Sequence, residues 1–311
     1  MTSLPRLSVR VGVTWAGRDL GSFWTLVDAL ETGGWDSLWL PDLAPLGGIA
    51  PLPLLAAAAA RTTRLKLGTN ALVLSAGNPV MAARELAAID AISAGRLLPT
   101  AALGLQRTRE REAMGVPKDE RAARLEEAVD VVRALWTGEP VTHDGRFWSF
   151  SDVQLSPRPS RPKLEMWLGA RSDVALRRVG RIGDGWLAAG VGPERLREGV
   201  ATIRAAAAEA GRTIDEDHYG ATIHAVREPD GLGTGQHRML ASQKDVEAED
   251  HIAHGIDAVR VLLERFIAAG ATKFVLILHA RDAPGWLREL REVIDPLEAA
   301  GAPAPSGDIS G

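Results

Sequence analysis

The stretch Gly34-Trp35-Asp36-Ser37-Leu38-Trp39-Leu40-Pro41-Asp42 sets the pattern that the whole chain repeats. The run Asp36–Leu40, which ends in three apolar residues, is too short for a helix. Pro41, which follows it, cannot donate a hydrogen bond to a strand ladder. This run therefore predicts a buried strand. The amphipathic run Phe23–Leu30 comes before it and ends at two glycines, as helices often do. Since Leu7–Val13 is another strand-like run, the segment predicts a parallel strand–helix–strand unit.

The same alternation recurs along the chain. Short apolar runs predict strands at Leu7–Val13, Asp36–Leu40, Leu65–Thr69, Arg96–Ala101, Leu164–Leu168, Trp186–Ala188, Tyr219–Val226 and Lys273–Leu278. Helical runs follow at Phe23–Leu30, Leu52–Ala60, Val80–Ile92, Arg121–Trp136, Val174–Val179, Glu194–Ala210, Ile252–Ala269 and Trp286–Leu297. This order predicts an α/β fold, a (β/α)8 TIM barrel. A doubly wound sheet competes, but Thr14–Arg18 after the first strand lacks the glycine spacing of a nucleotide-binding loop.

Two insertions and a tail interrupt this order. Val141–Phe150, after the fourth helix, contains an Asp-Gly turn between β-prone residues and predicts a hairpin. The polar insert Pro229–Asp250 follows the seventh strand and is longer than an ordinary connection, so we expect a lid. We predict one barrel domain over residues 1–300 and a disordered Gly/Pro/Ala-rich tail over residues 301–311.

Composition narrows the function classes. The chain has 36 Lys and Arg against 40 Asp and Glu, for a net charge of -4, so nothing suggests a nucleic-acid partner. It has no cysteine, which excludes disulfides, thiolate metal sites and cysteine catalysis and suits a cytoplasmic protein. The apolar stretch Pro51–Ala60 is too short to span a bilayer, so we expect no membrane partner.

Several motifs, in order, resemble the luciferase-like monooxygenase superfamily of flavin- and F420-dependent oxidoreductases. They are Gly34–Asp42, Arg64–Asn70 with Asn78-Pro79, Ile89–Arg96, Arg124–Gly138, Leu164–Gly169 and Gly183–Leu187. The resemblance extends from the first strand to the last helix. It implies an oxidoreductase that uses F420, or FMN as the alternative, on an organic small molecule. It also implies a homodimer, and a flavin reductase as partner if the cofactor is FMN. Separately, the few titratable groups at the predicted strand ends suggest an apolar substrate.

The resemblance implies a cofactor site at the C-terminal ends of the strands. It implies that Asp42 contacts the headgroup, that the Asn70–Ala71 peptide is cis and supports the ring, and that Gly190 lies near the phosphate. The expected cofactor-binding residues are Asp42, Asn70, Ala71, Gly104, Gln106, Gly169, Ala170, Arg171, Ser172 and Gly190. Independently, Gly169–Ser172 opens a helix, whose N–H groups suit a phosphate. A simple serine-capped turn is the alternative.

The sequence also departs from the family pattern. Many F420-dependent dehydrogenases carry a histidine after the aspartate, where this chain has Leu43, and some carry a catalytic glutamate where it has Gln106. Glutamine cannot exchange a proton, so the sugar-phosphate dehydrogenase mechanism is not carried over. The remaining catalytic candidates are His224 and His279, at the ends of the seventh and eighth strands, together with Gln106. A structural role stays open for each.

Other polar and aromatic residues allow two readings. His251 and His254 have a spacing that can bind metal, but we favour a solvated capping role and expect no metal. Trp15 and Trp39 either line a pocket or pack in the core. The basic run at Arg107, Arg109 and Arg111 reads as a solvated loop, with contact to an anionic cofactor tail as the alternative.

Two further function classes remain as alternatives. A non-catalytic barrel that only binds the cofactor would explain the changes at Leu43 and Gln106. A metal-dependent barrel hydrolase would need clustered histidines and aspartates at the strand ends, where only His224 and His279 offer ligands.

Overall fold

The structure is a computed structural model that describes residues 6–42, 48–104, 107–161, 163–228, 231–232 and 246–303. The chain divides into two compact units. Unit 1 contains the chain up to Thr14, Thr32–Asp36 and everything from Ala170 onward. Unit 2 contains Trp15–Glu31 and Ser37–Gly169.

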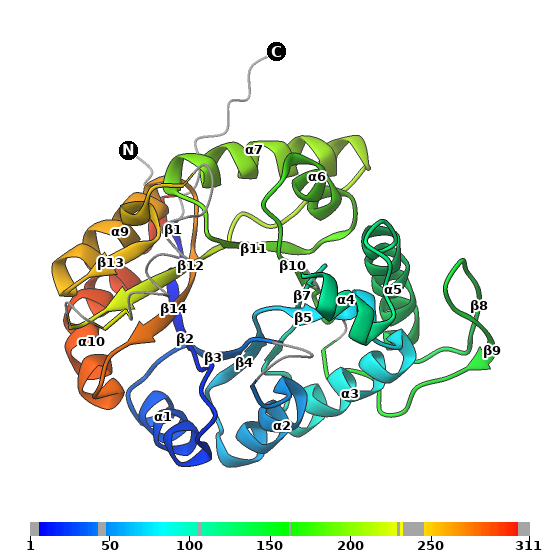
Figure 1. The fold of residues 1–311 in the computed structure, drawn as a ribbon, viewed down its shortest axis with the longest axis horizontal. Coiled ribbons are helices and arrows are strands. Elements are labelled where there is room, and N and C mark those ends of the chain that lie inside the picture. Colours follow the sequence, from blue (N-terminus) through cyan, green and yellow to red (C-terminus); the bar gives the residue numbers. More distant parts are fainter. Residues whose placement is uncertain are drawn as a thin grey trace. The chain divides into compact units, whose positions relative to one another are not determined.

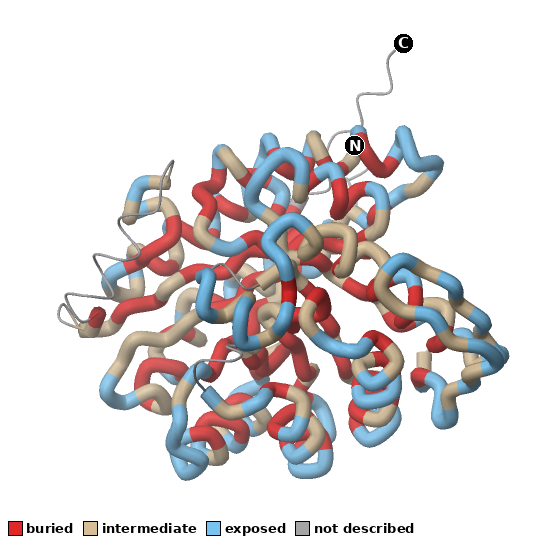
Figure 2. Tube along the Cα trace, turned by 45° about the vertical axis from the view of Figure 1, so that its right-hand side comes forward, coloured by how far each residue is buried: buried red, intermediate tan, exposed pale blue. Residues whose placement is uncertain are grey.

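Unit 1 is built on four parallel strands. In order across the sheet they are β11 (Gly185–Ala189), β12 (Tyr219–Val226), β14 (Lys273–His279) and β2 (Arg10–Thr14). The helices of this unit are α6 (Asp173–Ile182), α7 (Pro193–Glu209), α9 (Ile256–Ala268) and α10 (Ala283–Ala300). Burial alternates along the turns of these helices, so that each presents one apolar stripe to its neighbours (Figure 2).

Close approach between the elements of unit 1 depends on glycine. A Cβ atom on Gly199 of α7 would lie 2.5 Å from the indole of Trp186 on β11. One on Gly180 of α6 would lie 2.5 Å from the carbonyl oxygen of Ile203 on α7. These contacts explain why α6 and α7 pack closely together, with α7 against β11.

One predicted helix of unit 1 was wrong at its start. Residues expected to begin the helix Ile252–Ala269 instead form β13 (Ile252–His254), which pairs in parallel with the end of β12. Gly255, with φ +83°, separates this strand from α9, which begins at Ile256. Before β13 lies the short 3-10 helix η2 (Ala248–Asp250). Most of the expected lid, Pro229–Asp250, falls outside the described residues.

Unit 2 also has four strand positions, two of them interrupted. One row of parallel strands is β3 (Ser37–Leu40), β4 (Lys66–Thr69) and β6 (Leu97–Leu98), and a second is β5 (Leu72–Val73), β7 (Thr100–Ala102) and β10 (Trp167–Leu168). Pro99 has no N–H to donate and divides β6 from β7. The helices are α1 (Leu20–Thr32), α2 (Pro51–Arg61), α3 (Pro79–Ile92), α4 (Thr108–Met114) and α5 (Arg121–Trp136), with the 3-10 helix η1 (Leu74–Ala76).

Two details of unit 2 bear on the sequence predictions. The basic run at Arg107–Arg111 is not a loop, because Thr108–Met114 forms α4, with Arg107 at its N-cap and Gly115 (φ +64°) at its C-cap. The guanidinium of Arg96 ties three segments together, since it donates to the carbonyl oxygens of Leu65 at 2.6 Å and of Ala59 at 2.9 Å. We infer that Arg96 fixes α2 against the start of β4.

The predicted hairpin is confirmed as β8 (Val141–Asp144) and β9 (Ser149–Val153), which are antiparallel (Figure 1). Its turn is held by Glu127 of α5, whose carboxylate accepts hydrogen bonds from the N–H of Phe147 at 3.0 Å and of Trp148 at 2.9 Å. Burial of the carboxyl opposes its ionisation, but the Trp148 and Phe147 N–H groups, with His143, outweigh this and lower the pKa of Glu127.

The chain ends of the described region meet in a two-stranded antiparallel ribbon, β1 (Arg6–Leu7) with β15 (Ala302–Pro303). The rest of the expected tail, residues 304–311, lies outside the described residues. Over the part of the chain that the structure describes, no helix is both long and apolar enough to cross a membrane.

We predict that Glu127→Gln loosens the hairpin, because an amide accepts these N–H groups less strongly than a carboxylate. The free energy of unfolding should fall by about 1–3 kcal/mol, measured by urea denaturation near neutral pH. The depressed pKa stabilises the fold above the ordinary carboxyl pKa, and this stabilisation is lost as the pH falls through the folded value. The control is Glu139→Gln at an exposed position. Equal losses in the two variants would contradict the anchoring role.

Candidate functional site

The junction between β4 and β5 contains the predicted cis peptide bond, Asn70–Ala71. Thr69, just before it, joins β4 to β7 through one hydroxyl. The Thr69 Oγ1 donates to the Thr100 carbonyl oxygen at 2.8 Å and accepts from the Thr100 N–H at 2.8 Å. The junction is therefore fixed to the neighbouring strand on its buried side.

Small side chains gather beside this junction. A Cβ atom on Gly169, just after β10, would lie 3.3 Å from the Cβ of Ala102 and 3.9 Å from the Cβ of Ala71. The Gly169 N–H donates to the carbonyl oxygen of Ala101 at 2.8 Å. We call Ala71, Ala102 and Gly169 the small-residue face. It carries no side chain larger than a methyl group.

Asp42 and Gly104 both contact Val73 of β5. The Asp42 Oδ2 accepts a hydrogen bond from the Val73 N–H at 3.0 Å. Gly104 has φ +52°, and a Cβ on it would lie 2.5 Å from Val73 Cγ2, so a larger residue would be both strained and crowded. Its carbonyl oxygen accepts from the Arg121 guanidinium at 2.7 Å. Leu43 and Gln106, two positions central to the sequence argument, lie outside the described residues.

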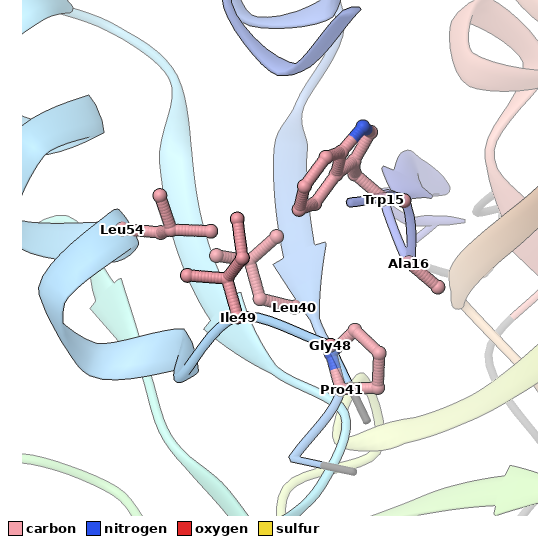
Figure 3. A pocket seen from close by; sticks show the side chains of 8 residues that line it. Trp15, Ala16, Leu40, Pro41, Gly48, Ile49 and Leu54 are labelled. Atoms are coloured by element: carbon pink, nitrogen blue, oxygen red, sulfur yellow. The ribbon is translucent and has the colours of Figure 1, made fainter. Parts of the chain in front are cut away.

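An apolar pocket lies at the ends of the first two strands of the chain's alternation. Figure 3 shows Trp15, Leu40, Ile49 and Leu54 converging on it. Its full lining is Trp15, Ala16, Gly17, Leu40, Pro41, Gly48, Ile49 and Leu54. Trp15 therefore lines a pocket. Trp39 is a core residue, 1% exposed, and packs so closely on Gly68 that a Cβ there would lie 2.2 Å from its ring.

In unit 1, Ser172 caps α6 as predicted, because its Oγ accepts from the Ala175 N–H at 3.4 Å. The loop before it is held by two donors. The Trp186 indole N–H donates to the carbonyl oxygen of Ala170 at 3.1 Å, and the Arg195 guanidinium donates to that of Arg171 at 3.1 Å. Arg195 also bonds the carboxylate of Asp173 and thereby lowers the pKa of Asp173.

Gly190 lies between β11 and α7 with φ +62°. The N-terminal turn of α7 faces a carboxylate, since a Cβ on Gly192 would lie 3.0 Å from the Asp250 side chain. Asp250 is paired with Arg265 at 2.8 Å. The N-terminal turn of α7 therefore lies beside a carboxylate whose charge Arg265 compensates.

Two histidines at neighbouring strand ends contact each other. His224 Nδ1 lies 2.9 Å from His279 Nε2, and the rings stack with centroids 5.1 Å apart. The ring of His251 approaches His224 edge-on, with centroids 6.2 Å apart. The sequence-based view of His251 as a solvated cap was wrong. His251 is fully buried. Its backbone carbonyl oxygen accepts from the His224 N–H at 2.9 Å, and its Nδ1 lies 3.1 Å from the Glu247 carbonyl oxygen.

Both histidines of this pair are neutral near pH 7. Burial, with smaller contributions from His279 and His251, lowers the pKa of His224 from 6.5 to about 3. Burial, with His254, also lowers the pKa of His279. The short N–N distance is thus a hydrogen bond between two neutral imidazoles, in which one ring donates and the other accepts.

Comparison with known proteins decides the family. The family model described as luciferase-like monooxygenase matches residues 7–230. The chain belongs to this family. An F420-dependent glucose-6-phosphate dehydrogenase of Beutenbergia cavernae is 33% identical over 259 residues, which cover 75% of this chain and 75% of that protein.

Solved structures agree on the fold. An F420-dependent secondary alcohol dehydrogenase in complex with an F420-acetone adduct superposes with a TM-score of 0.80, at 18% identity, over 93% of this chain and 99% of its own. The monooxygenase RslO1 from Streptomyces bottropensis gives a TM-score of 0.78, at 22% identity, over 92% of this chain and 99% of its own. These likenesses confirm the (β/α)8 class that the alternation predicts, and family membership makes the chain an oxidoreductase.

We predict that the buried His224 makes the protein less stable in acid. Because its folded pKa lies below the unfolded value of 6.5, its stabilising effect is complete above that value and is lost as the pH falls toward 3. When the pH falls from about 7.5 to about 4.5, the free energy of unfolding of the parent should decrease by roughly 2 kcal/mol more than that of His224→Asn. Urea denaturation of both proteins at the two pH values measures this, and parallel losses would rule it out.

Proposed function

We propose that this protein is an F420-dependent oxidoreductase that transfers a hydride to or from an organic small molecule. The observation that carries the proposal is the 33% identity, over three quarters of both chains, to an F420-dependent glucose-6-phosphate dehydrogenase. Bound F420 supplies a ring carbon that accepts or releases hydride, so the protein must position the substrate and exclude water.

In each unit by itself, the described residues suit one part of a deazaflavin. The small-residue face of Ala71, Ala102 and Gly169 lacks the side-chain atoms that would occupy the plane of a ring. Ser172 leaves part of the first turn of α6 available to a phosphate, and Arg171, exposed beside it, adds positive charge. We assign Asn70 to the ring edge and Asp42 to the headgroup, as the family resemblance implies.

The substrate differs in our proposal from that of the sugar-phosphate dehydrogenase. Leu43 and Gln106 replace the histidine and glutamate expected of such enzymes, so the proton chemistry must come from elsewhere. The apolar pocket at Trp15 favours an apolar substrate. We further propose that the protein acts in the cytoplasm as a homodimer.

FMN is the second candidate, because its isoalloxazine is also tricyclic and would use the same face. A type II Baeyer-Villiger monooxygenase component from Pseudomonas putida, solved in complex with FMN, shares the fold with a TM-score of 0.74 at 17% identity. With FMN, a separate flavin reductase would supply the reduced cofactor.

Titration of the purified protein with F420 and with FMN tests the proposal. We expect micromolar or tighter binding of F420 and weaker binding of FMN, followed by quenching of cofactor fluorescence. Gly169→Val places methyl groups on the small-residue face and should weaken F420 binding by roughly tenfold or more. The control, Ala208→Val, adds the same bulk at an exposed position of α7 and should bind as the parent does. Tight binding of FMN with no binding of F420 would overturn the proposal of F420 as the cofactor in favour of FMN.

A further inference from the structure

The two faces of the unit 1 sheet meet different surroundings. Phe274 of β14 packs against Phe266 of α9, with centroids 6.5 Å apart, so the Phe274 side of the sheet faces the helices. In the parallel register, Ile277 of β14 is level with His224 of β12 and with Thr14 of β2. Because side chains alternate along a strand, these three residues, together with His279, share the face turned away from the helices.

The C-terminal ends of these strands carry the polar groups of that face. His279 is the last residue of β14 and Thr14 the last of β2, while His224 is two residues from the end of β12. Chemistry in (β/α)8 enzymes is located at this end of the strands. The histidine pair and Thr14 are therefore where a substrate would be met.

Thr14 adds an independent observation. Its side chain is 8% exposed, and its Oγ1 has no hydrogen-bond partner among the described residues. An unsatisfied buried hydroxyl costs free energy unless something bonds it. A bound molecule with an oxygen atom would satisfy it.

We infer that Thr14, His279 and His224 form the site for the hydroxyl or carbonyl oxygen of the substrate, and that the two histidines pass its proton as a neutral relay. The inference rests on the proposed hydride transfer and adds its substrate class, an alcohol or the matching carbonyl compound. His279 is the member that contacts the substrate, because β14 pairs directly with β2 and Thr14. His224 lies behind it, between His279 and His251.

The relay balances atoms and charge. In the oxidation direction, the carbinol C–H leaves the alcohol as a hydride to oxidised F420, and the O–H proton passes to Nδ1 of His279. The proton on His279 Nε2 crosses the 2.9 Å hydrogen bond to His224 Nδ1, and the proton on His224 Nε2 leaves to water. The C–O single bond becomes a carbonyl, and both rings end neutral with their tautomers exchanged.

A metal site explains these residues less well. The two nitrogens that face each other are 2.9 Å apart, a hydrogen-bond distance at which one nitrogen carries the proton and has no lone pair for an ion. A purely structural pair is the remaining alternative. It predicts that amide side chains able to keep the hydrogen bond would serve equally well.

Amide substitutions separate a relay from a structural contact. His224→Asn places an amide near the position of Nδ1, and His279→Gln places one near Nε2, so both can keep the hydrogen bond but neither can pass a proton. Thr14→Val removes only the hydroxyl. The matched controls are His218→Gln, whose Nδ1 contacts the Asp184 carbonyl oxygen away from the pair, and Thr25→Val on α1.

Two readouts are measured on each variant loaded with F420. One is turnover of 2-propanol, cyclohexanol and 2-octanol, followed by loss of the oxidised cofactor's absorbance. The other is the ¹⁵N spectrum of the histidine rings, with cyclohexanone as an oxygen-bearing probe. We expect both histidine variants to bind F420 as the parent does and to lose roughly 100-fold or more in kcat. Cyclohexanone should shift the His279 resonances in the parent and not in Thr14→Val.

The outcomes distinguish this inference from the proposed function. Failure of the parent to bind F420 would overturn the proposed function. F420 binding with no alcohol turned over, or with turnover unchanged in His224→Asn and His279→Gln, would overturn the relay alone. A stoichiometric metal in the parent that both histidine variants lose would also overturn it in favour of a metal site.

Discussion

The alternation of side chains along β14 is the constraint on which unit 1 depends. Phe274 and Leu276 are fully buried, and Phe274 packs against α9, while Lys273, Ile277 and His279 lie on the opposite face. A register slip of one residue against β12 or β2 would exchange these two sets. The apolar contacts of Phe274 would be lost. Lys273 would also move away from Asp36, which would leave a buried charge without its partner. The packing that holds the helices therefore also fixes the position of His279.

Unit 2 is constrained by space rather than by polarity. Trp39 needs a glycine at position 68, Val73 needs one at position 104, and Ala102 accepts nothing large at position 169. Gly68 lies within β4, Gly104 comes two residues after β7, and Gly169 directly follows β10. The same absence of side chains that lets the strands approach also makes up the small-residue face, on which we propose that the cofactor ring lies.

Much of this fold is readable from the sequence, because each strand and helix carries its own local signal. The eight strands, the hairpin and the serine cap of α6 all depend on residues that are close together in the chain, whereas the cis bond follows from the family resemblance. Where prediction failed, the deciding partner was remote. The sequence of β13 alone resembles the start of a helix, but its pairing with β12 makes it a strand. The sequence Glu249-Asp250-His251 alone resembles a solvated cap, but the His251 ring packs against His224.

The histidine pair shows the same limit at the site. His224 and His279 could each be named from their positions at strand ends, but residues separated by 55 positions give no local sign that they touch. The approach of Asp250 to the start of α7 gives no local sign for a similar reason. That carboxylate belongs to the last residue of the long insert, far along the chain from α7. Long-range polar contacts thus decide the chemistry, whereas local patterns decide the scaffold.

A low pKa would make an isolated histidine a poor base, which raises the question of why this pair is buried. A single neutral imidazole that accepts a proton must hold the charge, and burial makes that costly. Two hydrogen-bonded imidazoles avoid the cost, since one takes up a proton as the other gives one up. Burial then prevents the proton from being trapped as an imidazolium and keeps both directions open. Such a relay needs no neighbouring carboxylate, which accounts for a family member that has glutamine at position 106 and leucine at position 43.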